Sequence, residues 1–527
     1  MPYRVLVTDT LADSGLDILR NDPEIELDYR PGIEGAALLE AISTAEALIS
    51  RSGTAITEEL LEAGKALKVA GRAGVGLDNV DVDAATARGI LVINAPTANI
   101  LSATEHTMAL LLALCRNVPA ADASMRRGEW TRSKFMGIEL SDKTLGIVGL
   151  GRIGSRVAVR AQSFGMKVLA YDPYIAPAAA QRVQADLVPL DRLLAEADFI
   201  TVHTPLTEET RGIIGAAEIA AMKDGVVLVN CARGGIYDET DLAAALNSGK
   251  VAAAAVDVFE EEPPPADHPL RHAKNIVLTP HIGANTWEAQ DRVAIQTSEM
   301  VVSALKGSIF VSAVNLPFQG TVDADAAPLI ALAEKLGLLV SQLLEGAPVE
   351  ANLELWGVEE RLTRILSVAS IKGLLSPHLS QSVNFVNAQA IAEARGLLTG
   401  STVHPVPHDY ANLLTFRARS TKGEVFASGT VFSEKTSRVV SVNQFRVEFE
   451  PEGYLIYMVN RDVPGVVGKV GTVLGDREIN IAEYNLARAP EGGKAMAIVT
   501  IDSALDEGTL SFLRSFKEME EVRLIKL

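Results

Sequence analysis

Cysteine is scarce in this chain. Only Cys115 and Cys231 occur among 527 residues, and they lie far apart in the sequence. A disulfide framework is therefore implausible, and a reducing compartment is favoured. No group of Cys, His, Asp and Glu has the spacing of a metal site, so no metal is expected.

Long hydrophobic runs and excess positive charge are missing too. The longest apolar run, Met108 to Cys115, is far short of the roughly 20 residues that a membrane span needs. The N-terminal residues run directly into a strand pattern rather than a signal peptide. The net charge of -19 argues against nucleic acid as a partner. We expect a cytoplasmic protein that binds neither membranes nor nucleic acid, and that captures any anionic ligand with local arginines.

The length and patterning predict several domains. A chain of 527 residues is too long for one core. Strand and helix patterns alternate up to about residue 95, and again from Lys143 to Thr279, which predicts an α/β fold with a doubly wound parallel Rossmann sheet. A helix over Thr286–Leu305 follows, and Phe310–Pro317 is expected to return the chain to the first domain.

The C-terminal half has a different pattern. After a linker at Thr321–Ala327, a strand at Phe426–Phe432 and a helix at Asn387–Leu398 indicate an α+β domain. The last 75 residues have a βαββαβ order, which is typical of a ferredoxin-like sheet. The expected domains are 1–98 with 285–317 (discontinuous and flavodoxin-like), 99–284 (nucleotide-binding), 318–450 and 453–527.

A glycine-rich turn is the strongest local signal. Gly149, Gly151 and Gly154 form G-x-G-x-x-G between a strand and a helix, where glycines permit a tight turn, close approach of a pyrophosphate and helix-on-strand packing. Asp172 ends the next strand and can bind both ribose hydroxyls of an adenosine. Because its charge would repel a 2′-phosphate, NAD is favoured over NADP.

Three side chains downstream of this turn suit hydride transfer to or from a 2-hydroxy acid. His281 follows a strand end and is the candidate base, because imidazole titrates near neutral pH. Glu262 would orient its ring and favour its protonated form. Arg233 offers a bidentate fork for a carboxylate. Each residue alone could be an ordinary loop residue; together, beside strand ends that share one crevice, they favour catalysis.

These segments resemble those of the D-isomer-specific 2-hydroxyacid dehydrogenases. Over nearly its whole length the chain is similar to the long-form branch that oxidises 3-phospho-D-glycerate to 3-phosphohydroxypyruvate, the first step of L-serine biosynthesis. The resemblance implies that Arg233, Glu262 and His281 are catalytic and that Asp257 lies near the nicotinamide. It implies further NAD contacts at Arg152, Ile153, Asp172, Thr204, Cys231, Ala232, Arg233, Asp257, His281, Gly283 and Ala284. For Cys231, packing in the cofactor pocket is favoured over a nucleophilic role.

The resemblance also assigns substrate and effector residues. Arg51, Ser52 and Asn99 correspond to substrate contacts, and Arg72 and Arg132 could add cations for a phosphate, although Arg132 could equally serve solubility. The C-terminal region resembles an ACT domain, in which Asn460, Asp462 and Asn480 would hold L-serine across a dimer interface. Either serine inhibits through this module or the module only dimerises. A homotetramer is implied.

Two other functions remain open. The first is a sibling enzyme, a hydroxypyruvate or glyoxylate reductase, against which the Arg51 cluster and the appended C-terminal half argue. The second is a non-catalytic regulator that senses NAD, against which the intact Arg, Glu and His argue.

Overall fold

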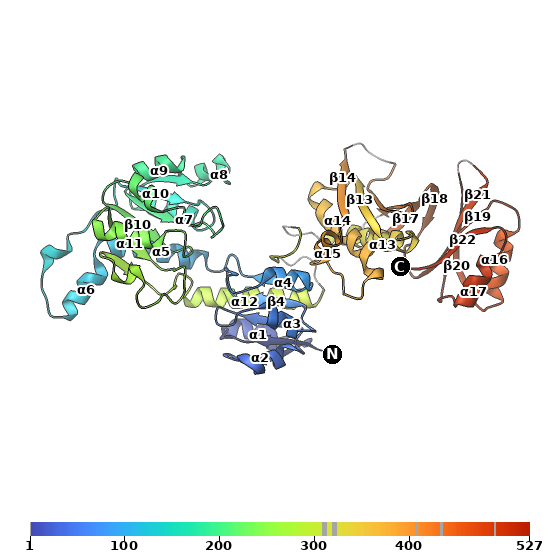
Figure 1. The fold of residues 1–527 in the computed structure, drawn as a ribbon, viewed down its shortest axis with the longest axis horizontal. Coiled ribbons are helices and arrows are strands. Elements are labelled where there is room, and N and C mark those ends of the chain that lie inside the picture. Colours follow the sequence, from blue (N-terminus) through green and yellow to red (C-terminus); the bar gives the residue numbers. More distant parts are fainter. Residues whose placement is uncertain (1, 308–312, 319–323, 406–408, 433–435, 490–491) are drawn as a thin grey trace.

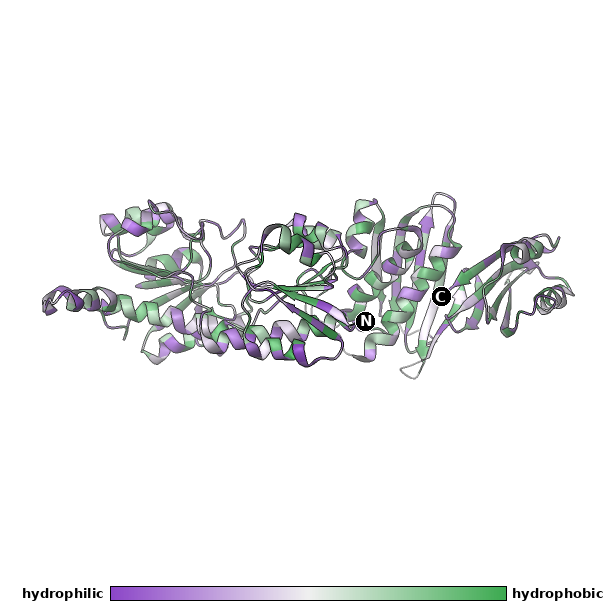
Figure 2. Cartoon of the chain, turned by 90° about the horizontal axis from the view of Figure 1, so that it is seen from below, coloured by the Kyte–Doolittle hydropathy of each residue, from purple (hydrophilic) through white to green (hydrophobic). Residues whose placement is uncertain are grey.

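The computed structural model describes residues 2–307, 313–318, 324–405, 409–432, 436–489 and 492–527. Within these ranges, four β-sheets follow one another along an elongated molecule (Figure 1). The Rossmann sheet lies at one end, the N-terminal sheet next to it, and the two C-terminal sheets beyond. In Figure 2 the strands are largely hydrophobic, whereas the helices alternate between hydrophilic and hydrophobic stretches, as helices that cover a sheet on one side do.

The N-terminal sheet has five parallel strands in the order β2-β1-β3-β4-β5, the flavodoxin-like order that the sequence predicts. The central strands carry consecutive buried residues, because helices cover both faces. The elements are β1 (Tyr3–Val7), α1 (Asp13–Asn21), β2 (Ile25–Tyr29), α2 (Gly35–Ile42), β3 (Ala47–Ser50), α3 (Glu58–Ala63), β4 (Val69–Arg72), α4 (Val82–Ala87) and β5 (Leu91–Asn94).

The chain returns to this sheet after the Rossmann sheet. Helix α12 (Trp287–Leu305) packs against α1 and β4, so closely that a Cβ on Gly71 would lie 2.8 Å from Val301. Asn315 then accepts a hydrogen bond of 2.9 Å from the backbone N–H of Val92 in β5. The described part of the predicted return segment therefore contacts the N-terminal sheet; residues 308–312 lie outside the described residues.

The Rossmann sheet has seven parallel strands in the order β12-β11-β10-β9-β6-β7-β8. The order reverses between β6 and β9, and in such sheets ligands bind outside the carboxyl ends of the strands at this switch point. The elements are β6 (Thr144–Val148), α7 (Gly154–Ser163), β7 (Lys167–Tyr171), α8 (Pro177–Arg182), β8 (Asp186–Leu187), α9 (Leu190–Glu196), β9 (Phe199–Val202), α10 (Ala216–Ala221), β10 (Val226–Asn230), α11 (Glu239–Ser248), β11 (Val251–Val256), the 3₁₀ helix η2 (Pro269–His272) and β12 (Ile276–Leu278).

Three helical elements connect or extend these two layers. Helix α5 (Ile100–Cys115) leads from the N-terminal sheet to the Rossmann sheet, and ten of its residues are buried. Helix α6 (Val118–Arg126) and the 3₁₀ helix η1 (Arg132–Phe135) then extend outward as an arm at the end of the molecule (Figure 1).

The third sheet contains the strand predicted at Phe426–Phe432, which lies within β16, and five strands that the sequence analysis did not name. The six strands lie in the order β14-β13-β15-β16-β17-β18, and α13 and α14 pack on the sheet. The expected helix at Asn387–Leu398 is shorter, because Gly396 adopts a left-handed φ of 70° that ends it. The elements are η3 (Ala324–Ala326), α13 (Ala327–Leu343), β13 (Pro348–Trp356), η4 (Glu360–Leu362), α14 (Thr363–Leu375), η5 (Ser376–His378), α15 (Ala388–Ala394), β14 (Leu398–His404), β15 (Leu413–Ser420), β16 (Glu424–Phe432), β17 (Thr436–Val442) and β18 (Phe445–Phe449).

The fourth sheet has the predicted βαββαβ order, with strands arranged β20-β21-β19-β22. Its helices cover one face, and its other face joins the core of the third sheet through residues such as Leu455, Ile498 and Ile525. The elements are β19 (Tyr454–Arg461), α16 (Val466–Gly475), β20 (Ile481–Arg488), β21 (Lys494–Ile501), α17 (Glu507–Arg514) and β22 (Met519–Lys526). Of the predicted turn at 490–493, residues 490–491 lie outside the described residues.

Within the ranges that the structure describes, no helix is both long and apolar enough to cross a membrane. The same residues contain no group of three or more His, Cys, Asp or Glu side chains that could hold a metal ion.

Candidate active site

A cleft of about 530 Å³ lies between the N-terminal sheet and the Rossmann sheet. The carboxyl ends of strands in both sheets meet there, because parallel strands present all their carboxyl ends on one side. Fourteen of the residues predicted from the sequence line it: Arg51, Ser52, Arg72, Asn99, Ile153, Thr204, Cys231, Ala232, Arg233, Asp257, Glu262, His281, Gly283 and Ala284.

The glycine-rich turn beside the cleft has the geometry that a dinucleotide requires. Gly149 has φ +93°, which favours glycine, and a Cβ on Gly154 would lie 2.1 Å from the carbonyl oxygen of Gly149. A Cβ on Gly151, in contrast, would have no protein atom within 4 Å. The first and third glycines are therefore needed by the fold, whereas the second leaves open space where a pyrophosphate can approach the backbone.

Asp172 follows β7 next to this turn. Its carboxylate accepts hydrogen bonds from the backbone N–H of Leu150 at 2.9 Å and of Tyr174 at 3.0 Å. These bonds fix the carboxylate beside the glycine turn. There it can accept hydrogen bonds from the ribose hydroxyl groups of NAD, and its negative charge can repel the 2′-phosphate of NADP. Arg152 lies within the glycine-rich turn, and its guanidinium donates a hydrogen bond of 3.3 Å to the carbonyl oxygen of Pro96.

His281 and Glu262 form a close pair. Nδ1 of His281 lies 2.7 Å from Oε2 of Glu262. The hydrogen bond to Glu262 raises the pKa of His281, against the opposing effect of burial. Burial opposes ionisation of Glu262, but the hydrogen bonds from His281 and from the N–H of Phe259 outweigh it and lower the pKa of this carboxyl group. Among the residues that the structure describes, no hydrogen bond to Nε2 of this imidazole is present, so this nitrogen could contact a hydroxyl group in the cleft.

Three arginines converge on the cleft from different strands. Arg51 follows β3, Arg72 ends β4, and Arg233 follows β10. Burial, then the charges of Arg51 and Arg233, lower the pKa of Arg72, and its Nε is buried without a hydrogen-bond partner among the described residues. In a protein with a net charge of -19, such a group of cations indicates an anionic ligand.

Asp257 is held by several groups, of which the sequence analysis did not identify His106. Its fully buried carboxylate accepts from Thr279 Oγ1 at 2.5 Å and from the backbone N–H of Gly283 at 2.8 Å, and lies 3.2 Å from Nε2 of His106. Burial opposes ionisation, but these contacts outweigh it and lower the pKa of Asp257. His106 lies within the apolar helix α5; a polar ring on such a helix was the only signal in the sequence.

The two cysteines are free and buried. Burial, with a smaller contribution from Asp257, raises the pKa of the Cys231 thiol to about 12. Burial raises the pKa of Cys115 to about 11. Both thiols therefore stay protonated at neutral pH, which disfavours a nucleophilic role for Cys231 and agrees with packing against the cofactor.

Arg132 is the exception among the predicted substrate residues. The structure places it in η1, on the exposed arm that follows α6, and it does not line the cleft of its own chain. The reason is that the chain leaves the domain at Arg116 and returns only near Leu140, so that the segment between them extends away from the cleft (Figure 1).

The predicted effector residues do not meet within one chain. Asp462 follows the end of β19 and pairs with Arg488 at 3.0 Å, whereas Asn480 precedes β20 and donates to Asp502. β19 and β20 run in the same direction, both antiparallel to β21, so these residues lie at opposite ends of the sheet, roughly 20 Å apart at about 3.3 Å per residue. The side chain of Asn460 is buried and donates to the carbonyl of Arg461. A shared effector site would need a second copy of the chain.

The sequence matches two family models. Residues 108–283 match the NAD binding domain of D-isomer specific 2-hydroxyacid dehydrogenases, and residues 325–443 match the D-3-phosphoglycerate dehydrogenase intervening domain. The D-3-phosphoglycerate dehydrogenase of Synechocystis sp. is 40% identical over 527 residues, covering 99% of this chain and 95% of that protein. The Bacillus subtilis protein of the same name is 39% identical and both chains are covered in full.

Solved structures resemble the part of the chain that contains the cleft. A glyoxylate reductase from Paecilomyes thermophila has a TM-score of 0.53 and 32% identity, covering 58% of this chain and 96% of its own. A D-lactate dehydrogenase from Aquifex aeolicus, solved with NAD and lactic acid, has a TM-score of 0.51 and 31% identity, covering 57% of this chain and 96% of its own.

Proposed function

Because this chain belongs to the D-3-phosphoglycerate dehydrogenases, within the D-isomer-specific 2-hydroxyacid dehydrogenases, we propose that it oxidises 3-phospho-D-glycerate to 3-phosphohydroxypyruvate with NAD, the first step of L-serine biosynthesis. The observation that carries the proposal is the placement of Arg51, Arg72 and Arg233 in one cleft with the His281–Glu262 pair. A substrate with a carboxylate, a phosphate and an oxidisable hydroxyl group would engage all three arginines and the His281–Glu262 pair.

His281 acts as the base. Its Nε2 takes the proton of the C2 hydroxyl group, and Glu262, on Nδ1, stabilises the imidazolium that forms. NAD, when bound, supplies the acceptor for the C2 hydride. Arg233 orients the substrate carboxylate and stabilises negative charge on the C2 oxygen. Closing the two domains over the cleft would exclude water.

Arg51 and Arg72 bind the phosphate in this proposal, with Ser52 and Asn99 beside them in the cleft. The unpartnered Nε of Arg72 is a donor that the described protein leaves unused. Arg72 lines the cleft, so its positive charge, rather than this buried nitrogen, would attract the phosphate. A sibling reductase that acts on an unphosphorylated acid has no use for these two cations.

The test compares substrates and variants. NADH formation is measured by absorbance at alkaline pH with 3-phosphoglycerate, glycerate, lactate and 2-hydroxyglutarate. We expect a strong preference for 3-phosphoglycerate. Arg72→Gln should raise KM for 3-phosphoglycerate by roughly tenfold to a hundredfold, since a charged hydrogen bond is worth about 1.5–3 kcal/mol, and should change KM for glycerate little.

Two outcomes would replace the proposal. Preference for glycerate or glyoxylate over the phosphorylated acid would reassign the protein to the sibling reductases. No turnover of any substrate, with NAD still bound, would make it a sensor of NAD.

We also propose a homotetramer that L-serine regulates. The exposed arm carries Trp130 and Met136 with 75% and 83% of their surfaces open to solvent, and such apolar side chains favour a second copy as their cover. Pairing of the C-terminal sheets of two copies would bring Asp462 of one chain toward Asn480 of the other. Trp130→Asp should lower the mass measured by light scattering, and Asp462→Ala should abolish any inhibition by serine.

The same proposal divides the chain by role. Residues 1–98 and 285–317 bind the substrate, 99–284 bind NAD, 318–450 form the intervening domain and 453–527 form the regulatory domain. Two free thiols support the cytoplasm as the compartment.

A further inference from the structure

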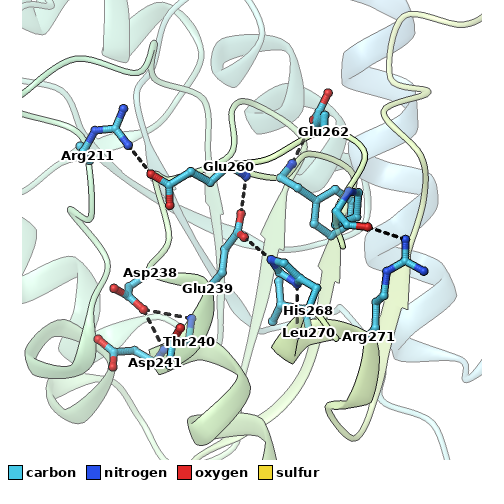
Figure 3. Close-up of polar contacts among 12 residues, drawn as sticks. Arg211, Asp238, Glu239, Thr240, Asp241, Glu260, Glu262, His268, Leu270 and Arg271 are labelled. Atoms are coloured by element: carbon cyan, nitrogen blue, oxygen red, sulfur yellow. Dashed lines mark hydrogen bonds and ion pairs between the residues drawn. The ribbon is translucent and has the colours of Figure 1, made fainter. Parts of the chain in front are cut away.

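The loop that carries Glu262 is held from outside the cleft by several side chains (Figure 3). The backbone N–H of Glu260 donates to Oε1 of Glu239 at 2.8 Å, and the side chain of Glu260 accepts from Arg211 at 2.5 Å. On the other side of Glu262, the carbonyl of Pro264 accepts from Arg271 at 2.8 Å. The loop is therefore fixed on both sides of the residue that contacts His281.

Glu239 is the centre of this arrangement. It lies in the first turn of α11, and its second carboxylate oxygen is 2.7 Å from Nε2 of His268. The side chains of Glu239 and His268 are only 11% and 10% exposed. Nδ1 of His268 accepts from the N–H of Leu270, so Nε2 carries the proton and donates it to Glu239. Figure 3 shows the Glu239 carboxylate between the Glu260 backbone and the His268 ring.

The His268 ring also supports the loop by packing. It meets the ring of Phe259 edge-on, with centroids 5.7 Å apart. The N–H of Phe259 in turn donates to Oε1 of Glu262 at 3.0 Å. A continuous set of contacts therefore runs from the His268–Glu239 pair through Phe259 and Glu260 to Glu262, and from Glu262 to His281.

The same loop contacts the loop of Arg233. A Cβ on Gly234 would lie 1.9 Å from the carbonyl carbon of Phe259. A shift of the Phe259–Glu262 turn would therefore press on the residue next to Arg233. The position of this turn determines the geometry of the predicted base and of the predicted carboxylate-binding arginine at once.

We propose that Glu239 and His268 are positioning residues of the dehydrogenase reaction, which hold the Glu262 turn where Glu262 meets Nδ1 of His281. Neither residue lines the cleft, so they act on the reaction through the turn that carries Glu262. This inference rests on the proposed function, because it takes His281 as the base.

If Glu239 only stabilised the N-terminus of α11, a different experimental result would be expected. Any carboxylate in the first turn of α11 stabilises the helix N-terminus. Asp241 lies in that same turn, but its carboxylate accepts from the N–H of Ala216 and not from the Glu262 turn. Asp241→Asn is therefore the matched control, which removes a carboxylate from the helix N-terminus and leaves the loop contacts in place.

The experiment measures kcat and KM for 3-phosphoglycerate against pH in the wild type, Glu239→Ala, Glu239→Gln and Asp241→Asn. We expect Glu239→Ala to lower kcat by about 10–100-fold, by analogy with the loss of an outer partner that orients a metal-ligating residue, and to leave the Kd of NAD unchanged. The charged groups around His281 are Glu262, Asp257 and Arg233. Displacing Glu262 lowers the pKa of His281, so the acidic limb of the pH profile moves to lower pH.

The conservative variants sharpen the test. Glu239→Gln keeps one acceptor oxygen and should recover part of kcat. His268→Gln can still donate toward Glu239 and should retain more activity than His268→Phe, which keeps a ring against Phe259 and loses the donor. Asp241→Asn should leave kcat and the profile unchanged. Circular dichroism of each variant shows that it is folded.

Three results would overturn the inference. They are an unchanged kcat and pH profile in folded Glu239→Ala, a change confined to KM, and an equal loss in Asp241→Asn. Failure of the proposed function is a separate result, because the wild type itself would then not oxidise 3-phosphoglycerate.

Discussion

The guanidinium of Arg233 lies 3.6 Å from the carboxylate of Asp78 across the cleft. Arg233 lies in the loop after β10 of the Rossmann sheet and Asp78 in the loop after β4 of the N-terminal sheet, so this contact joins the two walls. Asp78 is 76% exposed, which makes the pair weak in stability terms. Its importance lies in charge, because Asp78 is an anion beside the group that would bind the substrate carboxylate.

Asp78→Asn is expected to lower KM for 3-phosphoglycerate by about two- to fivefold, because removing a competing negative charge near Arg233 and Arg72 is worth about 0.5–1 kcal/mol. The free energy of unfolding should change by less than about 1 kcal/mol. Steady-state kinetics and chemical denaturation check both. A higher KM would show that Asp78 instead orients Arg233 for the substrate.

The oxidation and its reverse should depend on pH in opposite ways. Oxidation needs neutral His281 to accept a proton, and the hydrogen bond to Glu262 raises the pKa of His281. The oxidation rate should therefore increase as pH rises through this raised pKa, while the reduction rate, which needs the imidazolium, should decrease. Glu262→Gln should lower both rates and move both limbs to lower pH. Equal pH profiles for the two directions would exclude His281 as the proton carrier.

Replacing His281 itself by alanine should lower turnover by roughly 10²–10⁴-fold, the usual contribution of a general base. The Kd of NAD, measured by fluorescence titration, should change little if, as we propose, the glycine turn provides the main contacts to the dinucleotide. Turnover close to the wild-type value would remove His281 from the mechanism.

The three glycines of the turn should separate folding from cofactor binding. Gly154→Ala places a Cβ 2.1 Å from the Gly149 carbonyl oxygen, so it should destabilise the protein by about 1–3 kcal/mol, as overpacking does. Gly151→Ala meets no protein atom; it should leave Tm unchanged and weaken NAD binding by about tenfold or more, because the methyl group occupies the space of the pyrophosphate. A loss of Tm in Gly151→Ala with normal NAD binding would contradict this division.

Asp172→Asn tests cofactor selectivity. The amide keeps an oxygen that can accept from Leu150, so the fold of the turn should persist. We expect a Kd for NAD that is raised about tenfold, which corresponds to about 1.4 kcal/mol, and a smaller preference for NAD over NADP, since the charge that repels a 2′-phosphate is gone. Parallel titrations with both cofactors decide the point. An unchanged ratio would mean that Asp172 does not set the selectivity.

The sequence by itself determined those features of this protein that depend on backbone conformation and packing between residues close together in the chain. The G-x-G-x-x-G turn needs glycine at 149 because of a left-handed φ and at 154 because of close packing, and such requirements are visible in the residue types alone. The parallel order of both N-terminal sheets follows from alternating strands and helices, whose connections have one favoured hand. The ferredoxin-like order of the C-terminal domain was visible for the same reason.

Only the tertiary structure decided which side chains meet. His106 reaches Asp257, and Glu239 reaches the Glu260 backbone, over 151 and 21 residues of sequence; no local pattern encodes such contacts. In the third sheet only the strand at Phe426–Phe432 was predicted. β15 carries consecutive buried residues and β14 is mostly exposed, so these two strands lack the alternation that marks a strand, whereas β13 and β18 do alternate. Arg132 was considered as a further cation for a phosphate, yet its chain segment leads away from the cleft. The sequence determined the chemistry available, and the fold determined which groups share a cleft, because contact depends on how strands and loops are packed in space.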